Sequence, residues 1–167
     1  MKVKALMIMV FLCLVMVTKT HAFGLGAQVN LSTGGVLAPG ASLLFSPNHK
    51  THLALNWYLA RENENIIGLT LDRTLIPTQG SIFNVGILNF TLGLGVFTNV
   101  MFERNSRSDT EFRGGLRIPV GLSLSLGGDV LEIFTHVAPS FGVSFLPELG
   151  LSRPFFPIAL GARVWFR

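Results

Sequence analysis

The chain has 167 residues, of which 13 are Lys or Arg and 9 are Asp or Glu, giving a formal net charge of +4. Charged residues make up only 13% of the sequence, and the mean hydropathy of +0.53 is high for a soluble domain. No segment after residue 22 holds 18 consecutive apolar residues, which excludes helical membrane spans there. Alternating strands can carry the same hydrophobicity without any long apolar run.

Residues 1–22 are predicted to form a cleaved secretory signal peptide. Two lysines precede the apolar run Ala5–Val17, and Thr20–Ala22 places small residues before a cut ahead of Phe23. The alternative is an anchoring helix, but a run of 13 residues is shorter than the ~20 that span a bilayer. Cleavage would remove three lysines and the single cysteine, Cys13, leaving ten basic and nine acidic residues. This near-neutral balance gives no reason to expect a nucleic-acid partner.

The remaining residues, 23–167, are predicted to form one domain of β-strands, because large apolar residues alternate there with small or polar ones. Turn-rich or hydrophilic breaks separate eight strand candidates, which are in chain order 23–31, 36–45, 52–60, 66–75, 88–102, 112–126, 130–138 and 158–166. Pro39 and Pro119 interrupt the second and sixth candidates, and the sequence leaves open whether these prolines break their strands.

The alternation is clearest in residues 88–102 and 112–126. Large apolar residues such as Phe90 and Leu94 share one face, and small residues such as Gly93 and Gly95 share the other. A solvated face would carry Lys and Glu, whereas this second face is Gly, Ser, Thr and Asn with a few Arg, which suits a narrow interior. The fold class predicted is therefore all-β: an eight-stranded antiparallel up-and-down transmembrane β-barrel, apolar outside and polar inside.

The breaks between the strand candidates predict which end of the barrel carries short turns and which carries longer loops. The breaks at 46–50, 76–81 and 127–129 are compact turn sequences, whereas 61–65, 103–110 and 139–157 are longer or more hydrophilic. With an even number of strands both termini lie at one end, where short turns are expected. Recognition by surface loops is then expected from the opposite end, in Arg61–Asn65, Glu103–Thr110 and Ser140–Phe156. Aromatic residues near strand ends are expected to form membrane-interface girdles, namely Trp57, Tyr58, Phe102, Trp165 and Phe166.

Charged and titratable residues on the inward faces are the candidate site. The interior of an eight-stranded barrel is just wide enough for side chains to fill, and buried charges must pair. We therefore expect a structural ion-pair network that plugs the lumen; the alternative is a polar conduit or a gate of switchable ion pairs. The candidate residues are Asp72, Arg113, Arg117, Glu132, His136 and Arg163.

An enzymatic role for His136 is a further alternative. Glu132 and Ser140 supply the other residue types for acyl transfer. However, Glu132 and His136 are four residues apart on one strand face, about 13 Å, and no nucleophile-elbow motif is present. No cluster of Cys and His suggests a metal site. We predict that the protein is not an enzyme and has no cofactor or metal.

Residues 23–167 resemble, in architecture, the small eight-stranded bacterial outer-membrane barrels of the OmpA, OmpX and OmpW type. The most specific part is Ile158–Phe166, which resembles the final-strand signal read by the barrel-assembly machinery, although Arg167 follows the terminal aromatic residue. Residues 117–122 and 131–134 are similar to small barrels of spirochaete type. The resemblance implies a place in the cell outer membrane, contact with its lipid and insertion by the assembly machinery. It does not imply one activity.

Three functions remain as hypotheses. The first is a barrel that acts through its surface loops in envelope integrity, adhesion or contact with host or other extracellular ligands. The second is a narrow pore or a lateral route for small apolar molecules, as a resemblance to OmpW would suggest. The third is a soluble secreted barrel of lipocalin type, which would be extracted without detergent.

Overall fold

The computed structural model describes residues 22–33, 39–59, 64–82, 86–103, 110–146 and 149–166. The signal-peptide prediction falls outside these residues except for Ala22. No helix in the described part of the chain is long and apolar enough to cross a membrane. The strands are β1 (Phe23–Thr33), β2 (Gly40–Asn48), β3 (Thr51–Leu59), β4 (Glu64–Ile82), β5 (Gly86–Glu103), β6 (Glu111–Arg117), β7 (Val120–Leu126), β8 (Leu131–Val137), β9 (Ser140–Leu146), β10 (Gly150–Leu151) and β11 (Phe156–Phe166).

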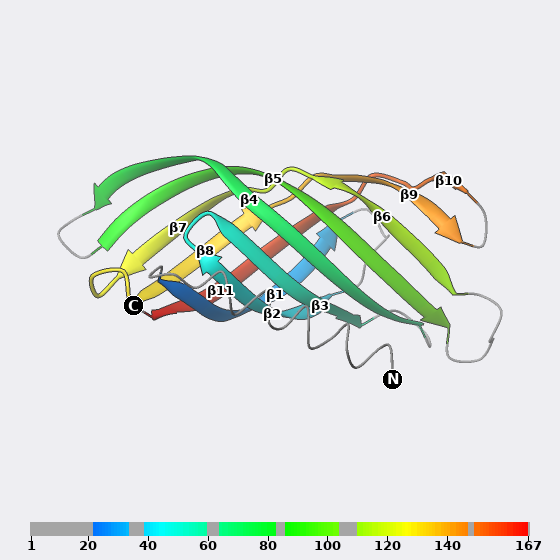
Figure 1. The fold of residues 1–167 in the computed structure, drawn as a ribbon, viewed down its shortest axis with the longest axis horizontal. Helices are drawn as coiled ribbons and strands as arrows, with labels where there is room; N and C mark the ends of the chain where they lie inside the picture. Colours follow the sequence, from blue (N-terminus) through cyan, green and yellow to red (C-terminus); the bar gives the residue numbers. More distant parts are fainter. Residues whose placement is uncertain are drawn as a thin grey trace, which may run out of the picture.

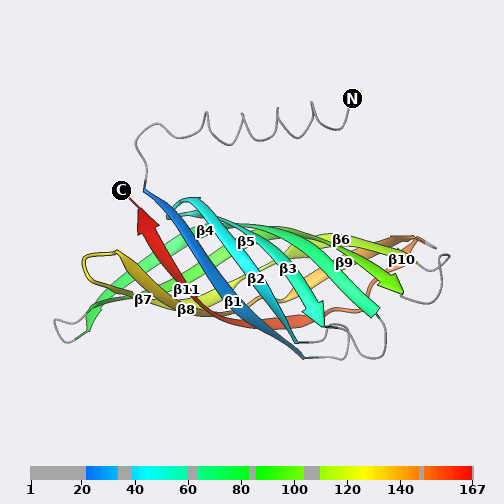
Figure 2. The ribbon, with the colours of Figure 1, turned by 90° about the horizontal axis from the view of Figure 1, so that it is seen from below.

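These strands form one closed antiparallel barrel (Figures 1 and 2). β6 and β7 both pair with β5, so they are two halves of one wall strand; β8 continues into β9, and β10 into β11, in the same way. The described residues thus give eight wall strands that pair with their neighbours in sequence. β1 pairs with β11 along its whole length and closes the ring, which confirms the predicted fold class.

The start of β1 and the end of β11 lie at one end of the barrel, as predicted: Phe23 pairs with Phe166. Figure 1 shows these two strand ends side by side at the left. We call this end the terminus end and the opposite end the loop end. The β7–β8 turn at the terminus end contains Asp129 at a φ of 68°, which follows Gly127 and Gly128 at similar angles. Glycine adopts such a φ without steric cost.

Three prolines lie at neighbouring positions across the wall. Each proline carbonyl accepts a backbone N–H from the adjacent strand, but proline has no N–H with which to return the second bond of the pair. Pro119 separates β6 from β7 and Pro139 separates β8 from β9, whereas Pro157 lies within β11. The bonds are Gly93 N to Pro119 O at 2.8 Å, Ile118 N to Pro139 O at 2.9 Å, and Ala138 N to Pro157 O at 2.9 Å. Pro39, the other open case, lies directly before β2.

Two predicted breaks are wrong. Ser140–Phe156 was expected to be a loop, but β9 occupies Ser140–Leu146 and β10 follows it, so most of this segment is barrel wall. The predicted turn at 76–81 is also wrong, because β4 runs on to Ile82 after a register shift between Thr74 and Ile76. In both places the sequence pattern around a proline was interpreted as the end of a strand, whereas the strand is only locally disturbed there.

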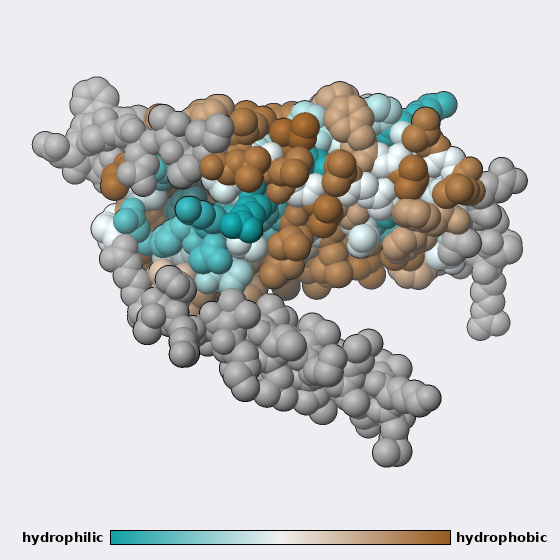
Figure 3. Space-filling model, turned by 45° about the horizontal axis from the view of Figure 1, so that its top comes forward, coloured by the Kyte–Doolittle hydropathy of each residue, from teal (hydrophilic) through white to brown (hydrophobic). Residues whose placement is uncertain are grey.

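The wall has an apolar outer face. Along β3, for example, Leu55, Trp57 and Leu59 are exposed while Ala54, Asn56 and Tyr58 are buried. Figure 3 shows hydrophobic residues spread over the wall, with a group of hydrophilic residues toward the left. The girdle prediction holds in part: Trp57, Phe102 and Phe166 are exposed, but Tyr58 and Trp165 are buried inside.

Candidate functional site in the barrel lumen

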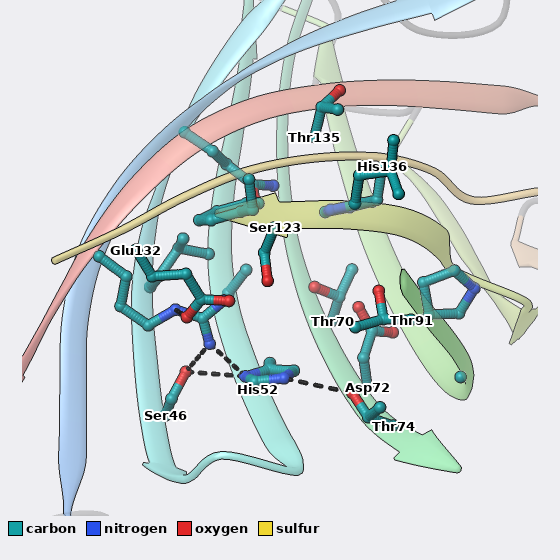
Figure 4. Close-up of a pocket in the computed structure, with 18 of the residues that line it drawn as sticks. Ser46, His52, Thr70, Asp72, Thr74, Thr91, Ser123, Glu132, Thr135 and His136 are labelled. Atoms are coloured by element: carbon teal, nitrogen blue, oxygen red, sulfur yellow. Dashed lines mark hydrogen bonds and ion pairs between the residues drawn. The ribbon is translucent and has the colours of Figure 1, made fainter. Parts of the chain in front are cut away.

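The structure brings five of the six predicted residues together inside the barrel. Asp72 comes from β4, Arg117 from β6, Glu132 and His136 from β8, and Arg163 from β11, and all five line one cavity (Figure 4). His52 of β3 belongs to the same group, although it was not among the predicted residues. We call these six residues the ionic cluster: His52, Asp72, Arg117, Glu132, His136 and Arg163.

Arg113 lies apart from the ionic cluster. Its guanidinium forms a bidentate pair with Glu111, with Nε to Oε1 at 2.5 Å and Nη2 to Oε2 at 2.6 Å. Ser144 also donates to Glu111 Oε1, at 3.0 Å. Both charged side chains are partly exposed at the loop end of β6. Glu111 was not among the predicted residues, because it falls between the predicted loop 103–110 and the predicted strand 112–126.

Glycines on neighbouring strands make room for the large charged side chains. Gly95 lies in register between Asp72 and Arg117, and a Cβ there would meet Asp72 Oδ1 at 2.0 Å. Gly26 lies opposite Arg163, where a Cβ would meet the Cα of that arginine at 2.9 Å. Long side chains therefore fit this narrow lumen because glycine stands across from them on the adjacent strand.

Arg163 is the most connected member of the ionic cluster. Its Nε lies 3.4 Å from Glu132 Oε2, and its Nη1 donates to Ser46 Oγ at 2.6 Å and also to His52 Nδ1. The guanidinium carbon lies 5.0 Å from the ring centroid of Phe134 and 5.1 Å from that of Trp165, within cation–π distance. The Trp165 indole in turn donates to Glu132 Oε2 at 2.8 Å.

Arg117 forms the second half of the ionic cluster. Its Nε lies 3.2 Å from Asp72 Oδ1, and its Nη2 lies 3.3 Å from His136 Nε2. Arg117 and Asp72 are both buried, with residue exposures of 4% and 8%. Charges buried this far from water must be paired, and their mutual attraction offsets part of the large desolvation penalty.

Both imidazoles of the ionic cluster accept hydrogen bonds from arginine. A guanidinium has donors only, so the ring nitrogen that faces it must be unprotonated. His52 therefore accepts at Nδ1 from Arg163, and His136 accepts at Nε2 from Arg117. The neutral form of each ring leaves two arginines and two carboxylates, so the ionic cluster is balanced in charge.

An apolar layer fills the lumen on the loop-end side of the ionic cluster. Tyr58 near the end of β3, Ile66 near the start of β4, Phe97 of β5 and Phe155 pack together, with Met101 beside them. The rings of Phe97 and Phe155 meet edge to face at a centroid distance of 5.1 Å. Since water does not pass readily through packed apolar side chains, two different layers obstruct the lumen.

Two cavities lie within and below the ionic cluster. The first, which we call the chamber, has a volume of about 70 Å³ and is lined by both arginines, both histidines and both carboxylates. The second, which we call the vestibule, is larger at about 320 Å³ and lies toward the terminus end, where His49, Lys50 and Asp129 line it. His52 and Glu132 line both cavities, so the chamber borders the vestibule.

The alternative of acyl transfer does not fit this geometry. Ser140 Oγ is buried and donates to Ala138 O at 2.8 Å, and Glu132 accepts from Trp165 and pairs with Arg163. His136 contacts Arg117 instead of a nucleophile. In the described ranges no group of three or more His, Cys, Asp or Glu could hold a metal ion.

The fold and the filled lumen define a class of architecture: a closed eight-stranded antiparallel barrel of the small outer-membrane type. The N-terminal β-barrel domain of Pseudomonas aeruginosa OprF is similar over 88% of this chain and 98% of that chain, with a TM-score of 0.57 and 18% identity. Neisserial surface protein A, NspA, is similar over 87% of this chain and 96% of its own, with a TM-score of 0.52 and 9% identity. At such identities the likeness shows the fold alone. No protein-family model matches the sequence, and no curated protein matches it.

Proposed function

We propose that the protein is a bacterial outer-membrane barrel that acts through the surface of its loop end and not through its lumen. The observation that carries the proposal is the inverted distribution of side chains. Among the described residues, 33 large hydrophobic residues are exposed, whereas the buried set includes Asp72, Arg117 and Arg163. A soluble barrel has no such apolar exterior, because exposed apolar patches of that size cause association. Lipid is the solvent that matches this wall.

The filled lumen supports a role outside the lumen. The apolar layer and the ionic cluster are stacked along the barrel interior. A rigid barrel with a filled lumen can act as a scaffold for the loops at its rim. Of the loops predicted to carry recognition, residues 61–63 and 104–109 lie outside the described residues. Envelope integrity, adhesion and contact with an extracellular or host ligand are the roles proposed for this rim.

A narrow pore is the second candidate, and one observation favours it. The vestibule gives water access from the terminus end as far as the ionic cluster, so the apolar layer and the ionic cluster are what obstruct a path through the barrel. A lateral route for apolar molecules is less compatible with the chamber, because arginine and carboxylate side chains line it. We also propose that the assembly machinery inserts the barrel and reads β11 as its signal. The last paired residue of β11 is Phe166.

Cysteine labelling in intact cells tests location and orientation together. The wild-type chain has one cysteine, Cys13 in the predicted signal peptide, so it reports the background. Asn105→Cys in the predicted loop 103–110 is expected to react with a membrane-impermeant maleimide in intact cells. Lys50→Cys, in the exposed turn at the terminus end, is expected to react only after the outer membrane is permeabilised. Labelling of Lys50→Cys in intact cells would contradict the proposed orientation, and a chain found only in the soluble fraction would contradict the membrane location.

A further inference from the structure

A hollow opens on the outer face of the wall where β11, β1, β2 and β3 lie side by side. Its volume is about 430 Å³. Gln28 and Ser42 border it, but both are buried on the inner face, so the side chains that line the hollow are all apolar. It offers a polar ligand no side-chain hydrogen bond, and its occupant must therefore be apolar.

Small side chains at neighbouring register positions make this hollow. The exposed alanines on the strands that the structure describes are Ala27, Ala41 and Ala162. Ala27 pairs with Ala162, and Ala41 pairs with Val29, two residues farther along β1. Larger exposed residues such as Leu43 stand beside them. The alanines of three adjacent strands thus lower the surface at one place in a wall that is otherwise covered by large apolar side chains.

Trp57 projects from the wall at the edge of this hollow. It pairs with Ala41 on the neighbouring strand and is 58% exposed. The wall therefore carries a large projection directly beside a depression. This arrangement suits a twofold dimer, because both copies then present the same patch and each projection meets the other copy's depression.

We propose that this face is the dimer interface of the protein in the membrane, with Trp57 of each copy seated in the hollow at Ala27 and Ala41 of the other. The inference rests on the proposed membrane location, since two barrels that span one bilayer in the same orientation present this patch at the same depth. Lipid tails are as apolar as the wall, so close packing and not apolar burial drives association there, and small residues allow close approach. The dimer sets two loop ends side by side.

A lipid acyl chain is the competing occupant of the hollow. An acyl chain has many rotatable bonds and loses their freedom when it is held against a rigid wall. Tryptophan has only two χ angles and supplies a large contact area at a low cost in conformational entropy. It is also enriched among the residues that anchor interfaces by filling a pocket. Dilution in lipid favours the acyl chain by mass action, so the dimer is expected to dissociate as the lipid content rises.

Cysteine cross-linking tests which face of the barrel meets the second copy. Leu43→Cys places a thiol beside the hollow, and Leu116→Cys places one at similar exposure on β6, on the opposite side of the ring of strands. The purified chain is reconstituted in lipid vesicles at several protein-to-lipid ratios and treated with a short bismaleimide. Leu43→Cys is expected to give a several-fold higher yield of cross-linked dimer than Leu116→Cys, and the yield is expected to fall on dilution. Equal yields at the two positions would overturn the proposal.

Two apolar substitutions separate the projection from the hollow. Trp57→Leu removes the projection and keeps the hollow, whereas Ala41→Leu fills the hollow and keeps the projection. Energy transfer between copies labelled at Lys50→Cys measures dimerisation in the vesicles. Each variant alone is expected to dimerise about tenfold more weakly than the unsubstituted wall, the effect of losing an interface anchor. In a mixture, Trp57 of one variant regains an intact hollow in the other, so mixed pairs are expected to form more readily than pairs of either variant.

The remaining outcomes separate this inference from the proposed location. Unchanged dimerisation in both variants, or mixed pairs no stronger than the variants' own pairs, would overturn the dimer. A barrel that inserts into the vesicles and stays monomeric at every ratio would overturn the dimer alone and indicate an acyl chain in the hollow, whereas a chain that does not insert would overturn the membrane location as well. Heat-modifiable migration verifies folding. If a variant does not fold, the comparison of Leu43→Cys with Leu116→Cys still decides.

Discussion

Replacement of Arg163 by Met is expected to destabilise the folded barrel by about 3–5 kcal/mol, the largest effect that we predict for a single substitution. Methionine keeps the apolar stem against Phe134 and Trp165 but removes the positive charge. Glu132 then remains in the lumen without its partner, and Ser46 loses the donor that now lies 2.6 Å from its Oγ. Urea unfolding of the barrel in lipid vesicles, followed by the gel shift between folded and unfolded forms, measures the loss.

Two comparisons separate burial of a charge from loss of packing. Glu132→Gln in the Arg163→Met background removes the uncompensated charge and is expected to restore part of the stability, while Gln still accepts from the Trp165 indole. Arg113→Met breaks the partly exposed pair with Glu111 and is expected to cost less than about 1 kcal/mol. Equal losses for Arg163→Met and Arg113→Met would contradict the view that the ionic cluster is a buried, mutually dependent unit.

Replacement of Leu55 by Arg is expected to destabilise the barrel in a bilayer by about 2–4 kcal/mol. Leu55 is the central residue of β3, and its exposed side chain lies in register between two other exposed leucines, Leu43 and Leu69. If this face contacts hydrocarbon, an arginine here must deform the bilayer or drag water into it. In a soluble barrel the same change on an exposed residue would shift stability by only about 0.5 kcal/mol.

Leu59→Arg is the matched control for Leu55→Arg. Leu59 is more exposed than Leu55 and ends the same strand, so an arginine there can reach the interface and is expected to cost about 0–1 kcal/mol. The difference between the two variants in lipid vesicles is the informative quantity. A loss near zero at both positions would show that this face does not contact lipid.

The alternation of residues predicted the two faces of the wall correctly, because side-chain direction in a strand depends on position parity alone. Register and depth are set by pairing between distant strands, which alternation does not report. Trp165 shows the consequence: its place near a strand end predicted an interface girdle, but its odd position directs it inward onto Glu132. Parity applied strictly would have corrected that prediction.

The sequence predicted which residues form the candidate site better than it predicted which of them contact one another. Inward parity selected Asp72, Arg117, Glu132 and Arg163, which the structure brings together, but it also selected Arg113, which pairs with Glu111 instead. The pairing of Asp72 with Arg117 depends on the register of β4, β5 and β6 through Gly95. A single sequence does not contain that register. The glycines opposite the long side chains were the available sequence signal for which strand positions lie side by side.

Prolines caused the largest error in the strand assignment. Residues 140–146 alternate as Ser140, Phe141, Gly142, Val143, Ser144 and Phe145, with both phenylalanines exposed on the wall. The pattern is as clear as that of the predicted strands, but Pro139 precedes it and Pro154 and Pro157 follow. Proline removes one ladder bond, and the adjacent strand still donates to the carbonyls of Pro139 and Pro157. A proline therefore removes a ladder bond from this wall without ending it.

Single-channel recording of the purified barrel in planar lipid bilayers at neutral pH tests the central claim most directly, that the lumen of this barrel is closed. Because the apolar layer of Tyr58, Ile66, Phe97 and Phe155 is stacked on the ionic cluster, we expect insertion without measurable current over a wide range of voltage. Folded, inserted protein is verified by its heat-modifiable migration in the same preparation. A persistent ohmic conductance from wild-type barrel would contradict the closed lumen and favour the narrow pore.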